Sequence, residues 1–213
     1  MKIETVIPIP KTQAPGSLND IRPISMTPLW SKIMEGFIAQ YTLLDTKKNW
    51  KKNQHGGKSG SSTDHVLVLL WDAVMGSLEG RGKKEKAAST VLCGVDFSKS
   101  FSRCSYQEIL GAYKGLGATQ WVINMHAAFL TGRKMRVKIG NVLSANCEVT
   151  GGAVQGSIMG VLDHNAVLET VEDGIDLQTE KYVDDLTLVE PIPQSRPSYV
   201  DEDNRRSYNA RGS

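Results

Sequence analysis

Apolar and polar residues follow two different periods along this chain, and each period predicts a different kind of element. Between Trp30 and Leu44, apolar residues recur every three or four positions, which is typical of an amphipathic helix. Between Lys134 and Ile139, basic and apolar residues alternate strictly before Gly140-Asn141, which predicts a β-hairpin with one basic and one apolar face. The pattern therefore predicts a chain that mixes helices with hairpin-forming strands.

Capping residues place the helix ends. Thr27 before Pro28 is a typical start for the first helix. Ser105 and Glu108 form a capping box for a helix that we expect to end at Gly115 or Gly117. Apolar runs after other capping or glycine-rich segments predict three more helices, at residues 63–76, 119–129 and about 160–171. The helix at 63–76 is apolar on most sides, so we expect it to be buried.

Short apolar runs predict the strands. Residues 5–10 contain prolines at positions 8 and 10 that cannot donate to a ladder, so we expect this strand not to be central. Residues 90–95 have the composition of a buried strand, which ends at Asp96, and residues 182–190 form the last expected element. Residues 191–213 are rich in Pro, Ser, Arg, Asn and Asp, which predicts a disordered tail.

Composition adds a charge asymmetry to this picture. The 213 residues, 40% of them apolar, suffice for one sizeable core or two closely packed lobes. The net charge is only +2, yet positions 47–58 hold five lysines and no acid, and positions 163–190 hold nine acids and one lysine. This distribution suits a protein that binds both a polyanion and cations. The alternative is two solvated faces.

Cysteine usage and hydropathy indicate an intracellular protein. The three cysteines form no CxxC pair, so neither a disulfide framework nor a zinc site is expected. The first residues do not resemble a signal peptide, and no apolar run approaches the roughly 18 residues of a membrane span. We therefore expect a protein that is not secreted and does not span a membrane.

Three carboxylates are candidates for metal chemistry. Asp184 and Asp185 lie between short apolar runs; such pairs are common at turns because short carboxylates accept bonds from local backbone donors. A carboxylate at the end of a buried strand, as expected for Asp96, is costly unless it is paired or binds a metal. If both strands share a sheet, Asp96 and Asp184 are expected to hold two magnesium ions about 3.5–4 Å apart, with Asp185 in a lesser role.

A phosphate-binding loop of the ATPase type is excluded. Residues 56–59 read Gly-Gly-Lys-Ser, but the glycine required five positions before the second glycine is Lys52. No buried strand is expected before this segment either.

Six segments occur in the order and spacing of reverse transcriptase motifs, and they most resemble those of non-long-terminal-repeat (LINE-like) retroelements. Three resemble the fingers motifs and three the palm motifs: residues 7–11, 21–25 and 55–64, then 96–101, 155–160 and 182–185. The resemblance implies an α+β right-hand polymerase whose palm is an antiparallel sheet backed by helices. It assigns residues 1–88 and 106–150 to fingers-like parts and residues 89–105 and 151–190 to the palm, and we expect no thumb after them.

The resemblance also implies roles for single residues. Asp96, Asp184 and Asp185 would be catalytic and would ligate two magnesium ions, which manganese can replace. The incoming nucleotide would contact five residues: Lys11, Arg22, Phe101, Gln155 and Gly156. Among them, Arg22 would pair with phosphate oxygens, and Phe101 would crowd a ribose 2′-hydroxyl and so favour deoxynucleotides. Template or primer phosphates would contact Lys58, Arg133, Lys134, Arg136 and Lys138.

The expected function is that of an RNA-directed DNA polymerase, a nucleotidyltransferase that uses an RNA template, a DNA or RNA primer and dNTPs. One alternative is a catalytically inactive nucleic-acid-binding remnant of such an enzyme. A second is an RNA-dependent RNA polymerase, which Phe101 disfavours. The chain departs from the family where Val154 replaces a usual proline and where residues 161–164 replace Pro-Leu-Leu-Phe; the sequence assigns no role to Asp163.

Overall fold

The structure is a computed structural model that describes residues 2–81, 86–97 and 99–193. Contacts divide the chain into two compact units. Unit 1 comprises Met1–Lys51 and Ser98–Asp173, and unit 2 comprises Lys52–Phe97 and Gly174–Ser213. The predicted fingers-like and palm-like ranges do not coincide with these units, and the assignment of those functional parts stays a prediction.

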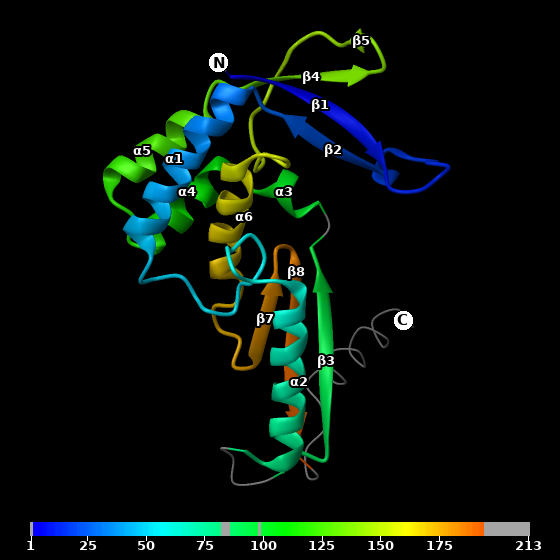
Figure 1. The fold of residues 1–213 in the computed structure, drawn as a ribbon, viewed down its shortest axis with the longest axis vertical. Coiled ribbons are helices and arrows are strands. Elements are labelled where there is room, and N and C mark those ends of the chain that lie inside the picture. Colours follow the sequence, from blue (N-terminus) through cyan, green and yellow to red (C-terminus); the bar gives the residue numbers. More distant parts are fainter. Residues whose placement is uncertain (1, 82–85, 98, 194–213) are drawn as a thin grey trace, which may run out of the picture. The chain divides into compact units, whose positions relative to one another are not determined.

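Unit 1 contains a sheet with strand order β2-β1-β4-β5, in which β6 also pairs with β4 (Figure 1). The strands are β1 (Ile3–Pro10), β2 (Ile21–Met26), β4 (Lys134–Ile139), β5 (Val142–Leu143) and β6 (Cys147–Glu148). The hairpin predicted around Gly140-Asn141 is present as β4 and β5.

The prediction that the first strand is not central was wrong. β1 lies between β2 and β4, antiparallel to the first and parallel to the second. The parallel ladder with β4 involves only Ile3–Val6. Pro8 and Pro10 therefore lie beyond the end of that ladder, in the part of β1 that pairs with β2 alone.

Five α-helices complete the described part of unit 1. They are α1 (Leu29–Thr46), α3 (Ser100–Arg103), α4 (Tyr106–Gly115), α5 (Gln120–Leu130) and α6 (Ile158–Val171), and a single 3-10 turn covers Leu18–Asp20. The capping box of α4 is confirmed, because Ser105 Oγ accepts from the Glu108 N–H at 3.1 Å and the Ser105 N–H donates to Glu108 Oε2 at 2.7 Å. These bonds from Ser105 lower the pKa of Glu108. The start of α1 differs from the prediction by one residue, since its N-cap is Pro28.

Helix α1 has the predicted apolar stripe but does not bury it. The buried positions are the small and polar residues Glu35, Ala39, Thr42 and Thr46. The exposed positions are Trp30, Ile33, Met34, Phe37, Tyr41 and Leu44. Specific polar contacts account for this orientation, since Glu35 Oε2 accepts from the Ile158 N–H at 3.0 Å and Thr42 Oγ1 lies 2.9 Å from His126 Nε2.

The core of unit 1 encloses Asp163, for which the sequence indicated no role. Asp163 is fully buried, and its Oδ1 accepts from the Tyr113 hydroxyl at 2.9 Å and from His126 Nδ1 at 2.8 Å. Burial, and then the nearby Asp163 carboxylate, raise the pKa of Tyr113 well above its usual value. Buried polar groups are normally hydrogen-bonded, and this cluster shows Asp163 as a structural acceptor between α4, α5 and α6.

The environment of Cys104 leads to a prediction for thiol labelling. Cys104 is buried and Cys147 is exposed. Burial raises the pKa of the Cys104 thiol to about 11, with smaller contributions from Glu108 and Asp163. At pH 8, three units lower, roughly a thousandth of this thiol is the reactive thiolate. We expect maleimide to label Cys147 within minutes and Cys104 only in denaturant, as followed by mass spectrometry; equal labelling rates in the native protein would contradict this.

The described part of unit 2 contains an antiparallel sheet with strand order β3-β8-β7 and the helix α2, which packs against all three strands (Figure 1). Its elements are α2 (Thr63–Glu79), β3 (Ser89–Asp96), β7 (Gln178–Tyr182) and β8 (Asp185–Ile192). The strand that ends at Asp96 and the strand that begins after the turn share one sheet, which is the condition on which the predicted metal site depends. An antiparallel sheet backed by a helix is also what the predicted palm requires, although this likeness does not identify the unit as a palm.

Three predictions for unit 2 were wrong. Strand β3, at the edge of the sheet, has no buried residue. Helix α2 is not buried on most sides, since Leu67, Val68 and Trp71 are 63–69% exposed. The predicted tail does not begin at position 191, because Pro191 belongs to β8 and pairs with Thr90 of β3. The ladder between β7 and β8 reaches only Val189, so this proline has a neighbouring strand on one side only. Residues 194–213 lie outside the described part of the chain.

No helix among residues 2–81, 86–97 and 99–193 is both long and apolar enough to cross a membrane.

Candidate functional site

The candidate metal-binding carboxylates lie at one end of the unit 2 sheet. Asp96, the last residue of β3, is directly opposite Asp185, the first residue of β8. Both are exposed. Directly opposed residues of an antiparallel pair have Cβ atoms about 4.5–5.5 Å apart on the same face, where like charges destabilise the pairing. A cation bound between the two carboxylates would offset this repulsion, so the pair favours cation binding.

Asp184 lies in the tight turn that joins β7 to β8. Tyr182 pairs with Asp185, so Val183 and Asp184 are the two turn residues. Val183 has φ 57°, the left-handed region that a β-branched residue rarely adopts. Such a conformation persists where surrounding contacts hold it, and it is found preferentially at functional sites.

The residues present fit a magnesium ion in type and number. Magnesium is usually held by one or two carboxylates together with substrate phosphates, and Asp96 and Asp185 supply two, with Asp184 adjacent. Across the described residues, no group of three or more His, Cys, Asp or Glu side chains is arranged to hold a metal ion. The register places Asp185, which we expected to have a lesser role, as the direct neighbour of Asp96.

Unit 1 brings two of the predicted nucleotide-binding segments together. The Ser25 N–H of β2 donates to the Gln155 carbonyl at 2.8 Å. Gly156 has φ 106°, and a Cβ at this position would lie 2.7 Å from the Ser25 carbonyl oxygen. Only glycine adopts this φ without strain, and only glycine leaves room for the Ser25 carbonyl oxygen at this distance. The loop that carries Gln155 is thus fixed to the strand that carries Arg22.

Phe101 is attached to the same loop. Its carbonyl accepts from the Ala153 N–H at 2.7 Å. Its ring is half-buried and stacks on His164, with ring centres 4.2 Å apart and planes at 5°. His164 is 1% exposed and replaces the phenylalanine usual in the resembled motif. The sequence shows the departure at position 164 but no sign of the contact between the two rings, because the residues are 63 positions apart.

Lys11 and Arg22, the other two predicted nucleotide-binding residues, are exposed in unit 1. Lys11 follows β1, and its N–H donates to the Asp20 carbonyl at 2.7 Å. Arg22 lies in β2 opposite Ile9. Both cationic side chains are thus accessible to a phosphate group from solvent.

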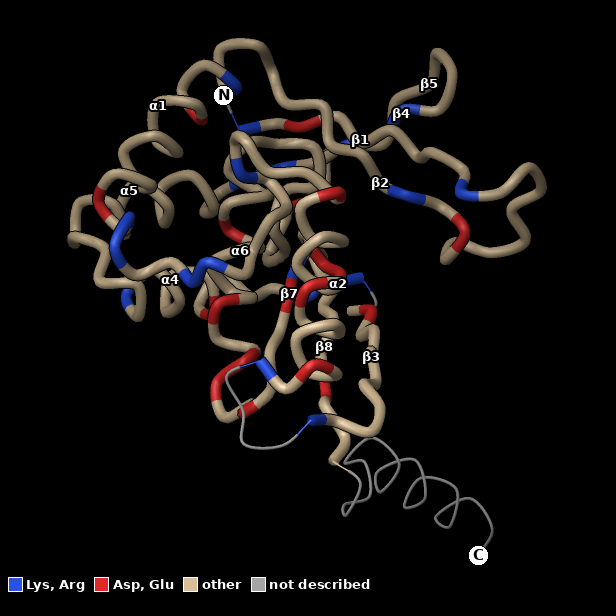
Figure 2. Tube along the Cα trace, turned by 60° about the horizontal axis from the view of Figure 1, so that its bottom comes forward, with Lys and Arg blue, Asp and Glu red and all other residues tan. Residues whose placement is uncertain are grey.

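Most of the predicted phosphate-binding residues are accessible, but Arg133 is not. Lys134 and Lys138 of β4 are exposed, and Arg136 is half-buried with its Nε donating to Thr5 Oγ1 at 3.2 Å. Figure 2 shows Lys and Arg positions along β4 and β2. Lys58 of unit 2 is half-buried.

Arg133 is 6% exposed, pairs with buried Glu4 and lies 5.3 Å from the centre of the Phe129 ring. Its predicted phosphate contact needs correcting on this geometry, because the guanidinium already has a buried counter-ion. The alternation of charges in the sequence did not reveal this partner, which lies 129 positions away.

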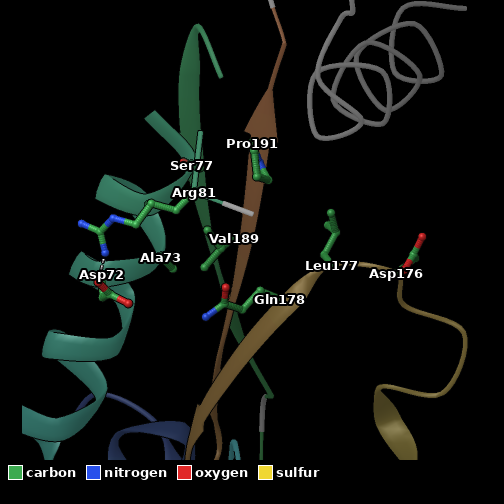
Figure 3. A pocket seen from close by; sticks show the side chains of 10 residues that line it. Asp72, Ala73, Ser77, Arg81, Asp176, Leu177, Gln178, Val189 and Pro191 are labelled. Atoms are coloured by element: carbon green, nitrogen blue, oxygen red, sulfur yellow. Dashed lines mark hydrogen bonds and ion pairs between the residues drawn. The ribbon is translucent and has the colours of Figure 1, made fainter. Parts of the chain in front are cut away.

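The described part of unit 2 also contains a pocket of about 270 Å³ that none of the predicted site residues lines (Figure 3). It lies between α2 and the β7–β8 hairpin. Among its lining residues, Arg81 Nη1 donates to Asp72 Oδ1 at 2.7 Å. Because Asp96, Asp184 and Asp185 do not line it, the pocket is separate from the carboxylate site.

Comparisons with known proteins support the fold. No protein-family model matches the sequence, and no curated protein matches it. Among solved structures, Candida tropicalis telomerase in complex with a TWJ fragment of telomeric RNA has a TM-score of 0.66 and 10% identity over 100% of this chain and 38% of that one. Apo telomerase from the same organism, truncated from the C-terminal domain, has a TM-score of 0.65 and 11% identity over 98% of this chain and 46% of that one.

A third structure, Candida albicans telomerase in complex with the same kind of RNA fragment, has a TM-score of 0.61 and 11% identity, over 99% of this chain and 40% of that one. The chain thus spans less than half the length of each of these structures. At such low identity the similarity concerns the fold alone. The chain therefore has an α+β fold similar to that of the matched part of these telomerase structures.

Proposed function

We propose that this chain is an RNA-directed DNA polymerase, a nucleotidyltransferase of retroelement origin. The observation that carries the proposal is the placement of Asp96 opposite Asp185, with Asp184 in the adjoining turn. The reverse-transcriptase-like fold supports the polymerase class. The LINE-like motifs in the sequence support the retroelement origin, whereas the similar structures reported above are telomerases.

The proposed reaction extends a primer by one nucleotide. The primer 3′-oxygen forms a bond to the α-phosphorus of a deoxynucleoside triphosphate, the bond from that phosphorus to the β-phosphate oxygen breaks, and pyrophosphate leaves. The hydroxyl proton is released to solvent. Asp96, Asp184 and Asp185 hold the cations in this proposal. Two magnesium ions, when bound, lower the pKa of the hydroxyl and neutralise charge on the leaving pyrophosphate.

The residues of unit 1 have binding roles in the proposal. Lys11 and Arg22 contact the triphosphate, and their exposed cations support this. Gln155 and Gly156 line the nucleotide pocket. Phe101 crowds the ribose 2′-position, and its stacking on His164 supports that role because a stacked ring has a fixed orientation.

The proposed partners are an RNA template and a DNA or RNA primer. Lys134, Arg136 and Lys138 alternate along β4 and so lie on one face of the strand. Such a basic stripe suits a phosphate backbone. The similar Candida structures in complex with an RNA fragment support an RNA partner for this fold.

Primer extension with the purified protein tests the proposal. We expect incorporation of dNTPs on an RNA template with magnesium or manganese, none in EDTA, and much slower incorporation of rNTPs. Faster incorporation of rNTPs than of dNTPs would instead indicate an RNA-dependent RNA polymerase and would contradict the role of Phe101.

A second candidate function is nucleic-acid binding without catalysis. It is favoured by the finding that the carboxylates do not form a three-residue metal cluster within the described residues. This candidate predicts salt-dependent RNA binding and no incorporation with either metal ion. Binding without incorporation in the same experiment would therefore replace the polymerase proposal with this one.

A further inference from the structure

A segment of unit 2 far away in the sequence extends the sheet at the carboxylate turn. The Lys181 N–H of β7 donates to the Asn53 carbonyl at 2.7 Å, and the His55 N–H donates to the Lys181 carbonyl at 2.9 Å. Gln54 thereby forms a parallel bridge with Lys181. Residues 53–56 thus lie along the outer edge of β7, immediately before the turn.

The Gln54 side chain bonds to both backbone groups of Val183. Its Oε1 accepts from the Val183 N–H at 3.1 Å, and its Nε2 donates to the Val183 carbonyl at 3.3 Å. The same Oε1 accepts from the Gly56 N–H at 2.9 Å. Gln54 is only 1% exposed, so water does not replace these bonds readily if the amide is removed.

The geometry of the turn requires such support. Val183 has φ 57°, which is strained for a β-branched residue. Gly56 lies against the same residue, because a Cβ on Gly56 would be 2.3 Å from the Val183 nitrogen. The close approach of this glycine and the two bonds from Gln54 together hold Val183 in a conformation that it does not favour by itself.

Asp184 and Asp185 follow Val183 directly, so the backbone of Val183 determines where their carboxylates lie. We propose that Gln54 is a positioning residue for the metal-binding aspartates, acting through the Val183 peptide. The inference rests on the proposed function of Asp184 and Asp185. Partners that orient metal ligands typically change metal affinity by about 10–100-fold when they are replaced.

The experiment compares the parent with Gln54→Met, which keeps the length of the side chain but lacks the amide, and with Gln54→Glu, which keeps an acceptor oxygen. Thr179→Val is the matched control, because it removes another partly buried bond of the same edge, which Thr179 Oγ1 accepts from Asn53 Nδ2 at 2.7 Å. Thr179 lies near the end of β7 that is away from the turn. Amide hydrogen exchange at Val183 reports on the turn. Mn²⁺ binding by electron paramagnetic resonance, without nucleic acid, reports on the aspartates.

In Gln54→Met we expect exchange at Val183 to become at least roughly tenfold faster and the Mn²⁺ dissociation constant to rise about 10–100-fold. Gln54→Glu should restore much of the protection at Val183, and Thr179→Val should leave both quantities unchanged. Unchanged exchange or Mn²⁺ affinity in Gln54→Met overturns the inference. So does an equal loss in Thr179→Val, since that indicates a general loosening of the edge.

Failure of the proposed function gives a different result. A parent protein that neither binds Mn²⁺ in an Asp184-dependent way nor incorporates nucleotides contradicts the proposed function itself, and Val183 exchange then still reports whether Gln54 holds the turn. If Gln54→Met does not fold, Gln54→Glu decides instead: its carboxylate keeps the bond from the Val183 N–H but cannot donate to the Val183 carbonyl, so exchange at Val183 should be faster than in the parent, and equal exchange in the two proteins overturns the inference.

Discussion

Asp96→Asn is expected to lower magnesium-dependent nucleotide incorporation by about 10²–10⁴-fold. The carboxylate lies opposite Asp185 in the sheet register, and the asparagine amide keeps its size but removes its charge. A correctly held metal ion stabilises transition-state charge by several kcal/mol, and about 1.4 kcal/mol corresponds to tenfold in rate. Single-nucleotide extension rates over a range of magnesium concentrations measure the effect.

Stability distinguishes this loss from a folding defect. Because Asp96 and Asp185 are like charges at opposed positions, removing one charge is expected to leave the thermal midpoint unchanged or higher in the absence of magnesium. Asp176→Asn is the control, since Asp176 is an exposed aspartate of the same unit outside the carboxylate site. Full activity in Asp96→Asn, or an equal loss in Asp176→Asn, would argue against the metal-binding role.

Gly160→Ala is expected to lower the free energy of unfolding by about 1–3 kcal/mol, the usual cost of overpacking a tight site. Gly160 is buried in the first turn of α6, and a Cβ there would lie 1.9 Å from the Val154 carbonyl oxygen and 2.6 Å from its carbonyl carbon. Because these are backbone atoms, no side-chain rotation relieves the clash. The loop that carries Gln155 must shift instead.

Gly111→Ala is the matched control for that substitution. Gly111 is also a helical glycine, in α4, and a Cβ on it would meet nothing within 4 Å. Alanine is favoured over glycine inside a helix by about 0.5–1 kcal/mol, so this variant should be more stable than the parent. Chemical denaturation of both proteins measures the two changes; a destabilisation of equal size in both would contradict the packing argument for Gly160.

Local sequence signals predicted the local elements well. The capping box at Ser105 predicted the start of α4, and the alternation before Gly140-Asn141 predicted the β4–β5 hairpin. Asp96 was predicted to end a strand, and it is the last residue of β3. Each of these features depends on residues a few positions apart or on a strand's own composition, which is why the sequence contains enough information.

Predictions of burial failed where distant partners decide it. The amphipathic pattern of α1 was predicted correctly, but it does not show which face packs inward: Glu35 and Thr42 turn the face opposite the apolar stripe inward through bonds to Ile158 and His126. Arg133 was grouped with the basic residues of β4, although Glu4 neutralises it in the interior. Neither partner is identifiable from the pattern around the residue itself.

The sequence by itself determined which residues are able to carry the proposed chemistry: two aspartates at a turn, one at a strand end, and the glycines and cations between them. Only the tertiary structure decided their relations. It placed Asp185 rather than Asp184 opposite Asp96, stacked Phe101 on His164, and brought Gln54 to Val183 across 129 positions of sequence. The reason is physical: hydrogen bonds and packing act over a few ångströms, and residues that are distant in sequence come that close only when the chain folds.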